Sequence, residues 1–201
     1  MRQVGLLLFP GFAEFEVMVA ASLLRDSHDL VTLALTEEAV TSEAGLIFSP
    51  HKPLEDVDPA ELDALIIPGG DMVHLKDTEP LFSFVGDLYK RGALLAAICS
   101  GPYVLARAGV FARRPYTVTF TKEQRDFLGC FGEAGFRYRP VLADGNVITA
   151  QGHAFAAFGL AVARHLCGDL SEDTTAFYEG RADAFMEPGV EATGVAQADS
   201  A

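Results

Sequence analysis

The feature of this sequence that most restricts its fold is a series of short, wholly apolar runs separated by segments with helical periodicity. Runs 4–9, 64–67 and 94–98 contain no charged residue, and each ends at a turn-forming sequence. Strands of this kind are covered on both faces, as in parallel sheets. Between the runs, residues 15–25 and 80–91 place apolar side chains at helical spacing. The alternation predicts an α/β fold of the flavodoxin-like type, a mainly parallel central sheet sandwiched by helices.

Weaker signals complete the expected order of elements. Residues 116–120 resemble a strand, and Thr121 with Gln124 forms the pattern of a capping box that opens a helix. The turn sequence at 144–146 predicts a strand over 147–149, followed by a long apolar helix over 154–166. From residue 187 onward the chain offers little to bury. We therefore expect one domain over 1–186 and a flexible tail over 187–201.

Composition narrows the class of protein. A chain of 201 residues, half of them hydrophobic, suits one ordinary globular domain. A formal net charge of -13 argues against a nucleic-acid partner, which favours a basic surface. No apolar run reaches membrane length. The three cysteines form no CxxC pair, which favours a reducing compartment, so we expect a cytoplasmic protein with no membrane partner.

Metals and bound cofactors are not expected either. The His, Cys, Asp and Glu residues do not cluster at metal-ligand spacing. The glycine-rich segments lack the fingerprint of a phosphate-binding loop. The chemistry of the chain is therefore expected to come from its own side chains.

Cys99 stands where strand 94–98 must turn abruptly into a helix that begins near Gly101. This is the geometry of a nucleophile elbow, which strains the backbone and requires small residues two positions to either side, here Ala97 and Gly101. The positive end of a helix favours a thiolate, so the interpretation predicts a lowered pKa for Cys99. The alternative is an ordinary buried thiol. The local pattern alone does not decide between them.

The glycines at 69 and 70 follow the central strand at the same edge of the expected sheet. An exposed N–H of Gly70 could pair with the amide of Ser100 to form an oxyanion hole. A plain turn at the end of a strand explains the two glycines equally well.

Four segments together resemble the DJ-1/PfpI superfamily, in order and spacing, over about residues 3–167. They are IIPGG at 66–70, AAICSGP at 96–102, LARAGVF at 105–111, and DGNVITA at 144–150 with the following Gly152. The segment around Cys99 is the specific one, and the resemblance implies that this thiol is reactive.

The resemblance also implies an acidic residue after the first strand that hydrogen-bonds the nucleophilic sulfur. Counted from Gly11, the matching residue is Glu16, with Glu14 as the nearby alternative. From the residues alone, Glu16 could simply serve the helix dipole. A carboxylate beside a thiolate is unfavourable, so we expect Glu16 to be protonated, with a raised pKa.

Departures from the family pattern bear on function. Protease-like members carry a His directly after the cysteine, where this chain has Ser100, and segment 136–139 lacks the His found in DJ-1 itself. The His-x-Glu motif of glutamine amidotransferases is also missing. Peptidase and glutaminase activities are therefore disfavoured. His74 and His153 are candidate accessory residues, although solvated loop positions explain them better.

The resemblance implies a homodimer that acts on a small electrophile through Cys99, by hydration of the kind seen in glyoxalases or isocyanide hydratases. A second hypothesis is a redox or stress sensor, in which an oxidant converts Cys99 to a stabilised sulfinate. A third is a ligand-binding scaffold that only retains the elbow. Cys130 and Cys167 have no elbow around them, and core packing is expected for both.

Overall fold

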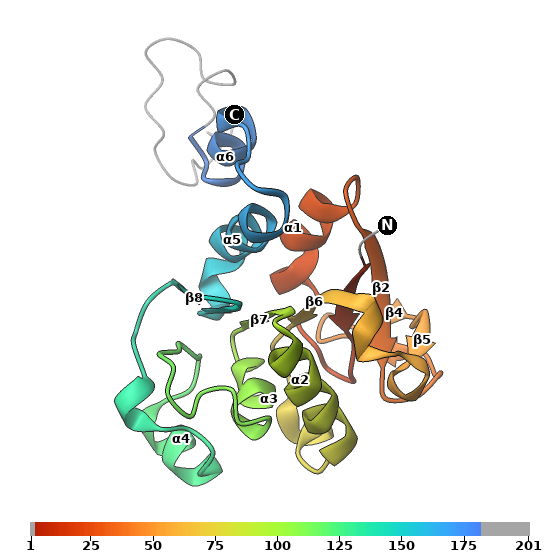
Figure 1. Ribbon diagram of the computed structural model, residues 1–201, viewed down its shortest axis with the longest axis vertical. Coiled ribbons are helices and arrows are strands. Elements are labelled where there is room, and N and C mark those ends of the chain that lie inside the picture. Colours follow the sequence, from red (N-terminus) through yellow and green to blue (C-terminus); the bar gives the residue numbers. More distant parts are fainter. Residues whose placement is uncertain (1–2, 182–201) are drawn as a thin grey trace, which may run out of the picture.

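The computed structural model describes residues 3–181, and its centre is a seven-stranded sheet (Figure 1). All neighbouring strands are parallel except the last pair, β9 and β8. The mainly parallel sheet predicted from the sequence is confirmed. In spatial order the strands are β5 (Lys52–Pro53), β2 (Asp29–Ala34), β1 (Gln3–Leu7), β6 (Leu62–Ile67), β7 (Leu94–Ile98), β9 (Val147–Ala150) and β8 (Val141–Asp144).

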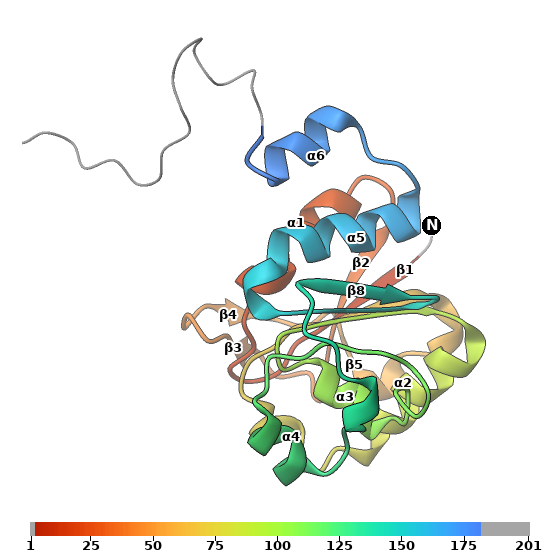
Figure 2. The same cartoon turned by 90° about the vertical axis from the view of Figure 1, so that its left-hand side faces the viewer.

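Helices cover both faces of the sheet, as Figure 2 shows most clearly. One face carries α1 (Phe15–Leu24) and α5 (Phe155–Cys167), with α6 (Glu172–Tyr178) lying beyond α5. The other face carries α2 (Glu79–Arg91) and α3 (Pro102–Arg107), with α4 (Lys122–Leu128) beside α3. Over residues 3–181, none of the helices has the length and apolar character needed to cross a bilayer.

Short elements connect these layers. The antiparallel pair β3 (Val40–Thr41) and β4 (Ile47–Phe48) forms a small separate hairpin. The 3-10 helices are η1 (Leu54–Asp56), η2 (Pro59–Glu61), η3 (Met72–Leu75), η4 (Glu133–Gly135) and η5 (Gly152–Ala154). The tail predicted over 187–201 lies outside the described residues.

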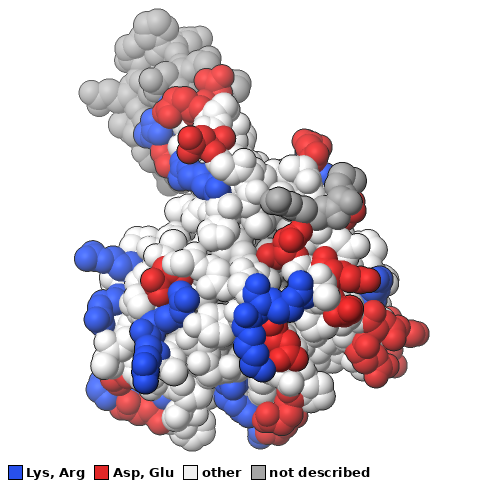
Figure 3. All heavy atoms as spheres, viewed as in Figure 1, with Lys and Arg blue, Asp and Glu red and all other residues white. Residues whose placement is uncertain are grey.

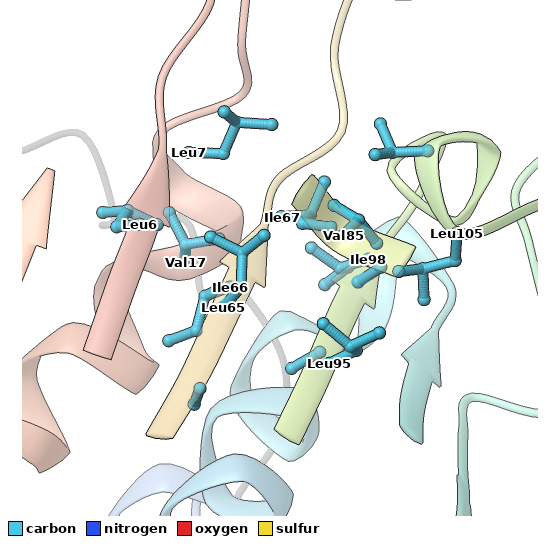
Figure 4. Packing of buried hydrophobic residues seen from close by; sticks show 14 of the residues in the cluster. Leu6, Leu7, Val17, Leu65, Ile66, Ile67, Val85, Leu95, Ile98 and Leu105 are labelled. Atoms are coloured by element: carbon cyan, nitrogen blue, oxygen red, sulfur yellow. The ribbon is translucent and has the colours of Figure 1, made fainter. Parts of the chain in front are cut away.

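The core is built from the central strands and both helical layers. Figure 4 shows β6 and β7 side chains packed with residues from the helices on either side. Those labelled include Ile66, Ile67 and Ile98 from the strands, and Val17 and Leu105 from the helices. Complete burial of each such side chain contributes about 1.5–3 kcal/mol. Doubly covered strands explain why the sequence runs lack any polar alternation.

Segment 116–120 is not the strand that the sequence predicts. Only Tyr116 forms a bridge, with Phe136. The Thr117 N–H donates instead to the side chain of Thr149, and the Thr119 N–H donates to the carbonyl of Cys99. The segment therefore crosses the ends of β7 and β9 rather than joining a ladder. The predicted capping box of Thr121 and Gln124 is present at the start of α4.

Charge is unevenly distributed over the face in Figure 3. Acidic side chains gather at the right-hand edge, over the region of β4 and β5 in Figure 1, while basic ones are more frequent in the left half. The basic side chains are interspersed with acidic and uncharged ones on this face. This face does not carry the continuous basic stripe that a phosphate backbone favours.

Helices α1 and α5 approach each other unusually closely at Gly159. A Cβ added there would lie 2.6 Å from Cγ1 of Val19 and 2.8 Å from the backbone nitrogen of Ala20. The second of these contacts involves backbone, so it can be relieved only by moving a helix. Gly159 thus sets the distance between α1, which carries Glu16, and α5, which follows Gly152.

We expect Gly159→Ala to destabilise the protein by about 1–3 kcal/mol, because overpacking outweighs the gain in helix propensity. Gly86→Ala in α2 is the matched control, since its nearest neighbour would lie at 3.9 Å. That change should instead stabilise the fold by about 0.5–1 kcal/mol. Urea unfolding followed by circular dichroism measures both. Equal stability of the Gly159→Ala variant and the wild type would contradict the proposed close contact.

Candidate active site

The backbone of Cys99 adopts a left-handed conformation at the end of β7. Its φ is 60°, and within residues 3–181 it is the one non-glycine residue with a positive φ. Hydrogen bonds hold this turn on both sides: the Cys99 N–H donates to Ala150 O at 2.9 Å, and Cys99 O accepts from Thr119 N–H at 2.8 Å. A strained conformation of this kind costs about 1–3 kcal/mol and persists only where its surroundings enforce it. The geometry is that of a nucleophile elbow.

Small residues make the elbow possible, as the sequence predicts. A Cβ on Gly101 would lie 2.6 Å from Pro68 O and 2.7 Å from Ile67 O. Ala97, on the other side of Cys99, is completely buried in β7. The turn therefore packs directly against the end of β6, which brings the loop at 68–70 next to the cysteine.

Glu16 lies beside the sulfur of Cys99. It is the second residue of α1, it is buried, and its side chain hydrogen-bonds the thiol. Its Oε2 also accepts a hydrogen bond of 2.7 Å from the Gly69 N–H. Glu14 is buried too, but within the described residues its Oε2 has no hydrogen-bond partner, and it makes no hydrogen bond with Cys99. The structure thus brings Glu16 and Cys99 together.

Two glycines enclose this pair. A Cβ on Gly69 would lie 2.7 Å from Oε2 of Glu16 and 3.0 Å from Sγ of Cys99. A Cβ on Gly152 would lie 2.9 Å from Oε1 of Glu16 and 3.0 Å from the same sulfur. Any side chain at either position would displace the carboxyl group, the thiol or both. The sequence analysis noted both glycines but did not assign them this role.

The lowered pKa predicted for Cys99 is wrong. Burial, the neighbouring charge of Glu16 and the hydrogen bond to Glu16 raise the pKa of the thiol to about 12. The pKa of Glu16 is raised, which is the expected direction, but the main cause is burial and not a neighbouring thiolate. The sequence argument counted the helix end, but α3 is only six residues long and the desolvation of the sulfur outweighs it. Between the two pKa values the pair holds one proton and one negative charge.

Ser100 fixes the loop that follows β6. Its hydroxyl accepts from the Gly70 N–H and donates to Gly70 O, both at 2.9 Å. The Ser100 N–H hydrogen-bonds the Cys99 sulfur and lowers the pKa of the thiol, though by less than burial raises it. Gly70 has a φ of 127°, and a Cβ there would collide with the carbonyl oxygen of Gly11. To serve as an oxyanion donor, the Gly70 N–H must exchange its bond to Ser100 for one to the substrate.

Thr119 is a site residue that the sequence analysis missed. Its hydroxyl hydrogen-bonds the Cys99 sulfur, which lowers the pKa of the thiol. The hydroxyl has a single proton, which it can donate either to this sulfur or to Oε1 of Gln151, 3.0 Å away, and it accepts from the Gly152 N–H at 3.0 Å. Gln151 is buried and anchored by its own donors to Thr117 and Val118. A strand assignment for 116–120 concealed this contact, because it gave no reason for Thr119 to face the elbow.

The candidate histidines stay outside this cluster. His74 lies on η3 and His153 on η5, and both are exposed. Neither hydrogen-bonds Cys99 or Glu16 within residues 3–181, which fits the interpretation as solvated positions. The same residues contain no group of three or more His, Cys, Asp or Glu that could hold a metal ion.

The other two cysteines differ from each other. Cys130 is partly buried against the core, as expected. The expectation that Cys167 packs in the core is wrong, because it ends α5 and its thiol is exposed. The last turn of this helix is not apolar, since it contains Arg164 and His165.

Comparisons with known proteins agree with the fold. A model of the DJ-1/PfpI family matches residues 2–165. The glutathione-independent glyoxalase DJR-1.2 of Caenorhabditis elegans is 31% identical over 160 residues, covering 77% of this chain and 83% of the relative. The isonitrile hydratase of Pseudomonas putida is 28% identical over 170 residues, covering 83% of this chain and 72% of the relative.

A solved structure is similar over almost the whole chain. The DJ-1 superfamily protein Atu0886 from Agrobacterium tumefaciens superimposes with a TM-score of 0.80 and 26% identity. The match covers 92% of this chain and 99% of the other.

The raised pKa of Cys99 predicts that its thiolate is scarce at neutral pH. Thiolate absorbance at 240 nm, taken as wild type minus Cys99→Ala, should stay near zero up to about pH 10 and rise as the pH approaches about 12. Glu16→Gln removes the neighbouring charge, so the same signal should appear at lower pH. A full thiolate signal from wild-type Cys99 at pH 7 would contradict the assignment.

Proposed function

The chain belongs to the DJ-1/PfpI family, and from that premise we propose that it hydrates a small electrophile through covalent addition to Cys99. The observation that carries the proposal is the buried carboxyl of Glu16, hydrogen-bonded to the Cys99 sulfur between Gly69 and Gly152. A nucleophile within hydrogen-bond reach of a base is the arrangement that covalent catalysis requires. Small carbonyls and isonitriles are the electrophile classes that the similar glyoxalase and isonitrile hydratase suggest.

The first step is addition with proton transfer. The S–H bond of Cys99 breaks, its proton passes to the Glu16 carboxylate, and the sulfur forms a bond to the electrophilic carbon. Glu16 then returns the proton to the substrate. With an aldehyde the proton reaches oxygen and a hemithioacetal forms, whereas with an isonitrile it reaches the same carbon and a thioimidate forms. The negative charge passes to the substrate when Glu16 takes the proton, and Glu16 regains it when the proton is returned.

Water completes the reaction in both cases. Addition of water to the thioimidate expels the Cys99 thiol and leaves an N-substituted formamide. With a 2-oxoaldehyde, one proton moves from C1 to C2 and a second moves from the C1 hydroxyl to the C2 oxygen, which converts the hemithioacetal into a thioester. Water then releases the 2-hydroxy acid and the thiol. Glu16 is positioned to move these protons, and its raised pKa makes it a better base than an exposed carboxylate.

Peptidase and glutaminase chemistry is not proposed. Those reactions use a histidine to protonate a leaving amine, and no histidine within residues 3–181 hydrogen-bonds Cys99 or Glu16. Addition to an aldehyde or isonitrile expels no amine, so a single carboxyl group suffices. The homodimer expected from the sequence stays a prediction.

The redox sensor is the alternative, and the partial exposure of Cys99 favours it. Thr119 and the Ser100 N–H could hydrogen-bond the oxygens of a sulfinate. Peroxide reacts with the thiolate, however, and burial together with Glu16 disfavours that form. The hydratase proposal needs no standing thiolate, because Glu16 removes the proton during the addition.

Catalysis is tested with methylglyoxal and a neutral isonitrile, followed by proton NMR for the 2-hydroxy acid and the formamide. Cys99→Ala should abolish turnover, and Glu16→Gln should lower kcat by about 100-fold or more, because general acid–base catalysis is lost. Cys167→Ala is the control and should retain wild-type turnover, since its thiol lies at the end of α5. Undiminished turnover of both substrates by Cys99→Ala would refute the proposal.

Oxidation separates the hydratase from the sensor. At pH 7 and low peroxide, we expect the exposed Cys167 to gain oxygen before Cys99, because the raised pKa keeps Cys99 as a thiol. Glu16→Gln should speed the oxidation of Cys99. Intact-mass spectrometry with peptide mapping measures both. Two oxygens gained at Cys99 while Cys167 stays unmodified would instead favour the sensor.

A further inference from the structure

An apolar groove lies beside the Cys99 site, between η3 and α4. Its volume is about 470 Å³, and Met72, Val73, Phe120, Phe127 and Leu128 provide its apolar walls. Phe127 is 90% exposed and Val73 is 59% exposed. Apolar side chains that are exposed to solvent and line a groove are more typical of a binding surface than of the exterior of an ordinary helix.

The groove is continuous with the candidate active site at two points. Gly70, whose N–H bonds to the Ser100 hydroxyl, lines the groove directly. Phe120, on the opposite wall, directly follows Thr119, whose hydroxyl hydrogen-bonds the Cys99 sulfur. The two loops that border the reacting sulfur thus continue as the two walls of the groove.

The charged residues of the groove exclude one class of ligand. Asp71 and Glu123 both line it, and no basic residue is among its lining residues. Asp71 is held in place because its Oδ1 accepts a hydrogen bond of 3.1 Å from the Val73 N–H. Both carboxylates are exposed and partly screened by solvent, so they disfavour an anionic ligand and tolerate a neutral one.

A second cavity of about 530 Å³ does not share this connection. Leu35, Leu54, Pro80 and Phe84 are among its lining residues. It contains none of the residues assigned to the Cys99 site. Its volume alone therefore gives no link to the chemistry.

We propose that the groove between η3 and α4 binds the apolar substituent of the electrophile that reacts at Cys99. The inference rests on the proposed function and narrows its substrate class. The substrate is a neutral molecule with an aryl or alkyl group next to the reactive carbon, and a molecule with a carboxylate at the end of that group is rejected. Phe127 is the main contact, with Val73 on the facing wall.

The test compares alkylation of Cys99 by iodoacetamide and by N-(2-phenylethyl)iodoacetamide. Each rate constant is normalised to reaction with N-acetylcysteine, and the modified peptide is identified by mass spectrometry. The wild type should prefer the phenylethyl reagent, and Phe127→Ala should lower that preference by about tenfold, the effect of losing one buried aromatic contact. Phe177→Ala is the matched control: Phe177 is 58% exposed on α6, a helix beyond α5 on the other face of the sheet from α4.

The charge argument has its own arm. A phenylethyl reagent that bears a para carboxylate should react more slowly with the wild type than the neutral reagent does. Asp71→Asn combined with Glu123→Gln should remove most of that difference, because both carboxylates of the groove are then neutral. An unchanged preference in Phe127→Ala, or equal rates for the neutral and anionic reagents in the wild type, would overturn the inference.

A binding measurement separates this inference from the proposed function. The probe is the neutral fluorophore N-phenyl-1-naphthylamine, and two double variants are compared, Cys99→Ala with Phe127→Ala and Cys99→Ala with Phe177→Ala. The first should bind the probe at least tenfold more weakly than the second. If Cys99→Ala keeps full turnover of both substrates, the proposed function fails, and this binding result still decides whether the groove is a ligand site. Equal affinities in the two double variants would overturn the groove itself.

Discussion

The left-handed backbone of Cys99 has to be held in place by several parts of the chain at once. The Ala150 carbonyl at the end of β9 accepts its N–H, and the Thr119 N–H from the crossing segment bonds to its carbonyl. Gly101 allows the turn to lie against the end of β6. The strained residue after β7 thus requires β6, β9 and the segment 116–120 to keep fixed positions. Gly69 follows β6, Gly152 follows β9, and Thr119 lies in the crossing segment.

Close packing around the sulfur has an electrostatic consequence. Gly69 and Gly152 leave no room for a side chain between the backbone and the Glu16–Cys99 pair, and around this pair the carboxyl group is buried and the thiol is half-buried. That burial is the largest cause of the raised pKa values of both groups. A buried carboxylate is a stronger base than a solvated one, and a buried thiol keeps its proton until a base removes it. The site therefore keeps the Cys99 thiol protonated and places a proton acceptor against it.

The sequence predicts those features that depend on local pattern. Wholly apolar runs identify the central strands, and the Thr121–Gln124 capping box identifies the start of α4. The elbow at Cys99 follows from a strand, a cysteine and a glycine in close succession. The direction in which the Cys99 pKa shifts does not follow from the local pattern. Segments distant in the sequence remove water from the sulfur, and an argument from the local helix end does not include that cause. Segment 116–120 has the side-chain pattern of a strand, but its N–H groups bond to Thr149 and to the elbow, partners that only the tertiary fold brings near.

Under the proposed function, two separate parts of the molecule select the same kind of substrate. Between its two pKa values the Glu16–Cys99 pair carries one negative charge in a buried position, where screening by solvent is weak. An anionic group brought against the sulfur is repelled by that charge. The groove beyond Gly70 contributes Asp71 and Glu123 at a different place and through a different element of the fold. An anionic substrate is thus repelled both at the Cys99 sulfur and in the groove. A neutral, apolar electrophile is repelled at neither place.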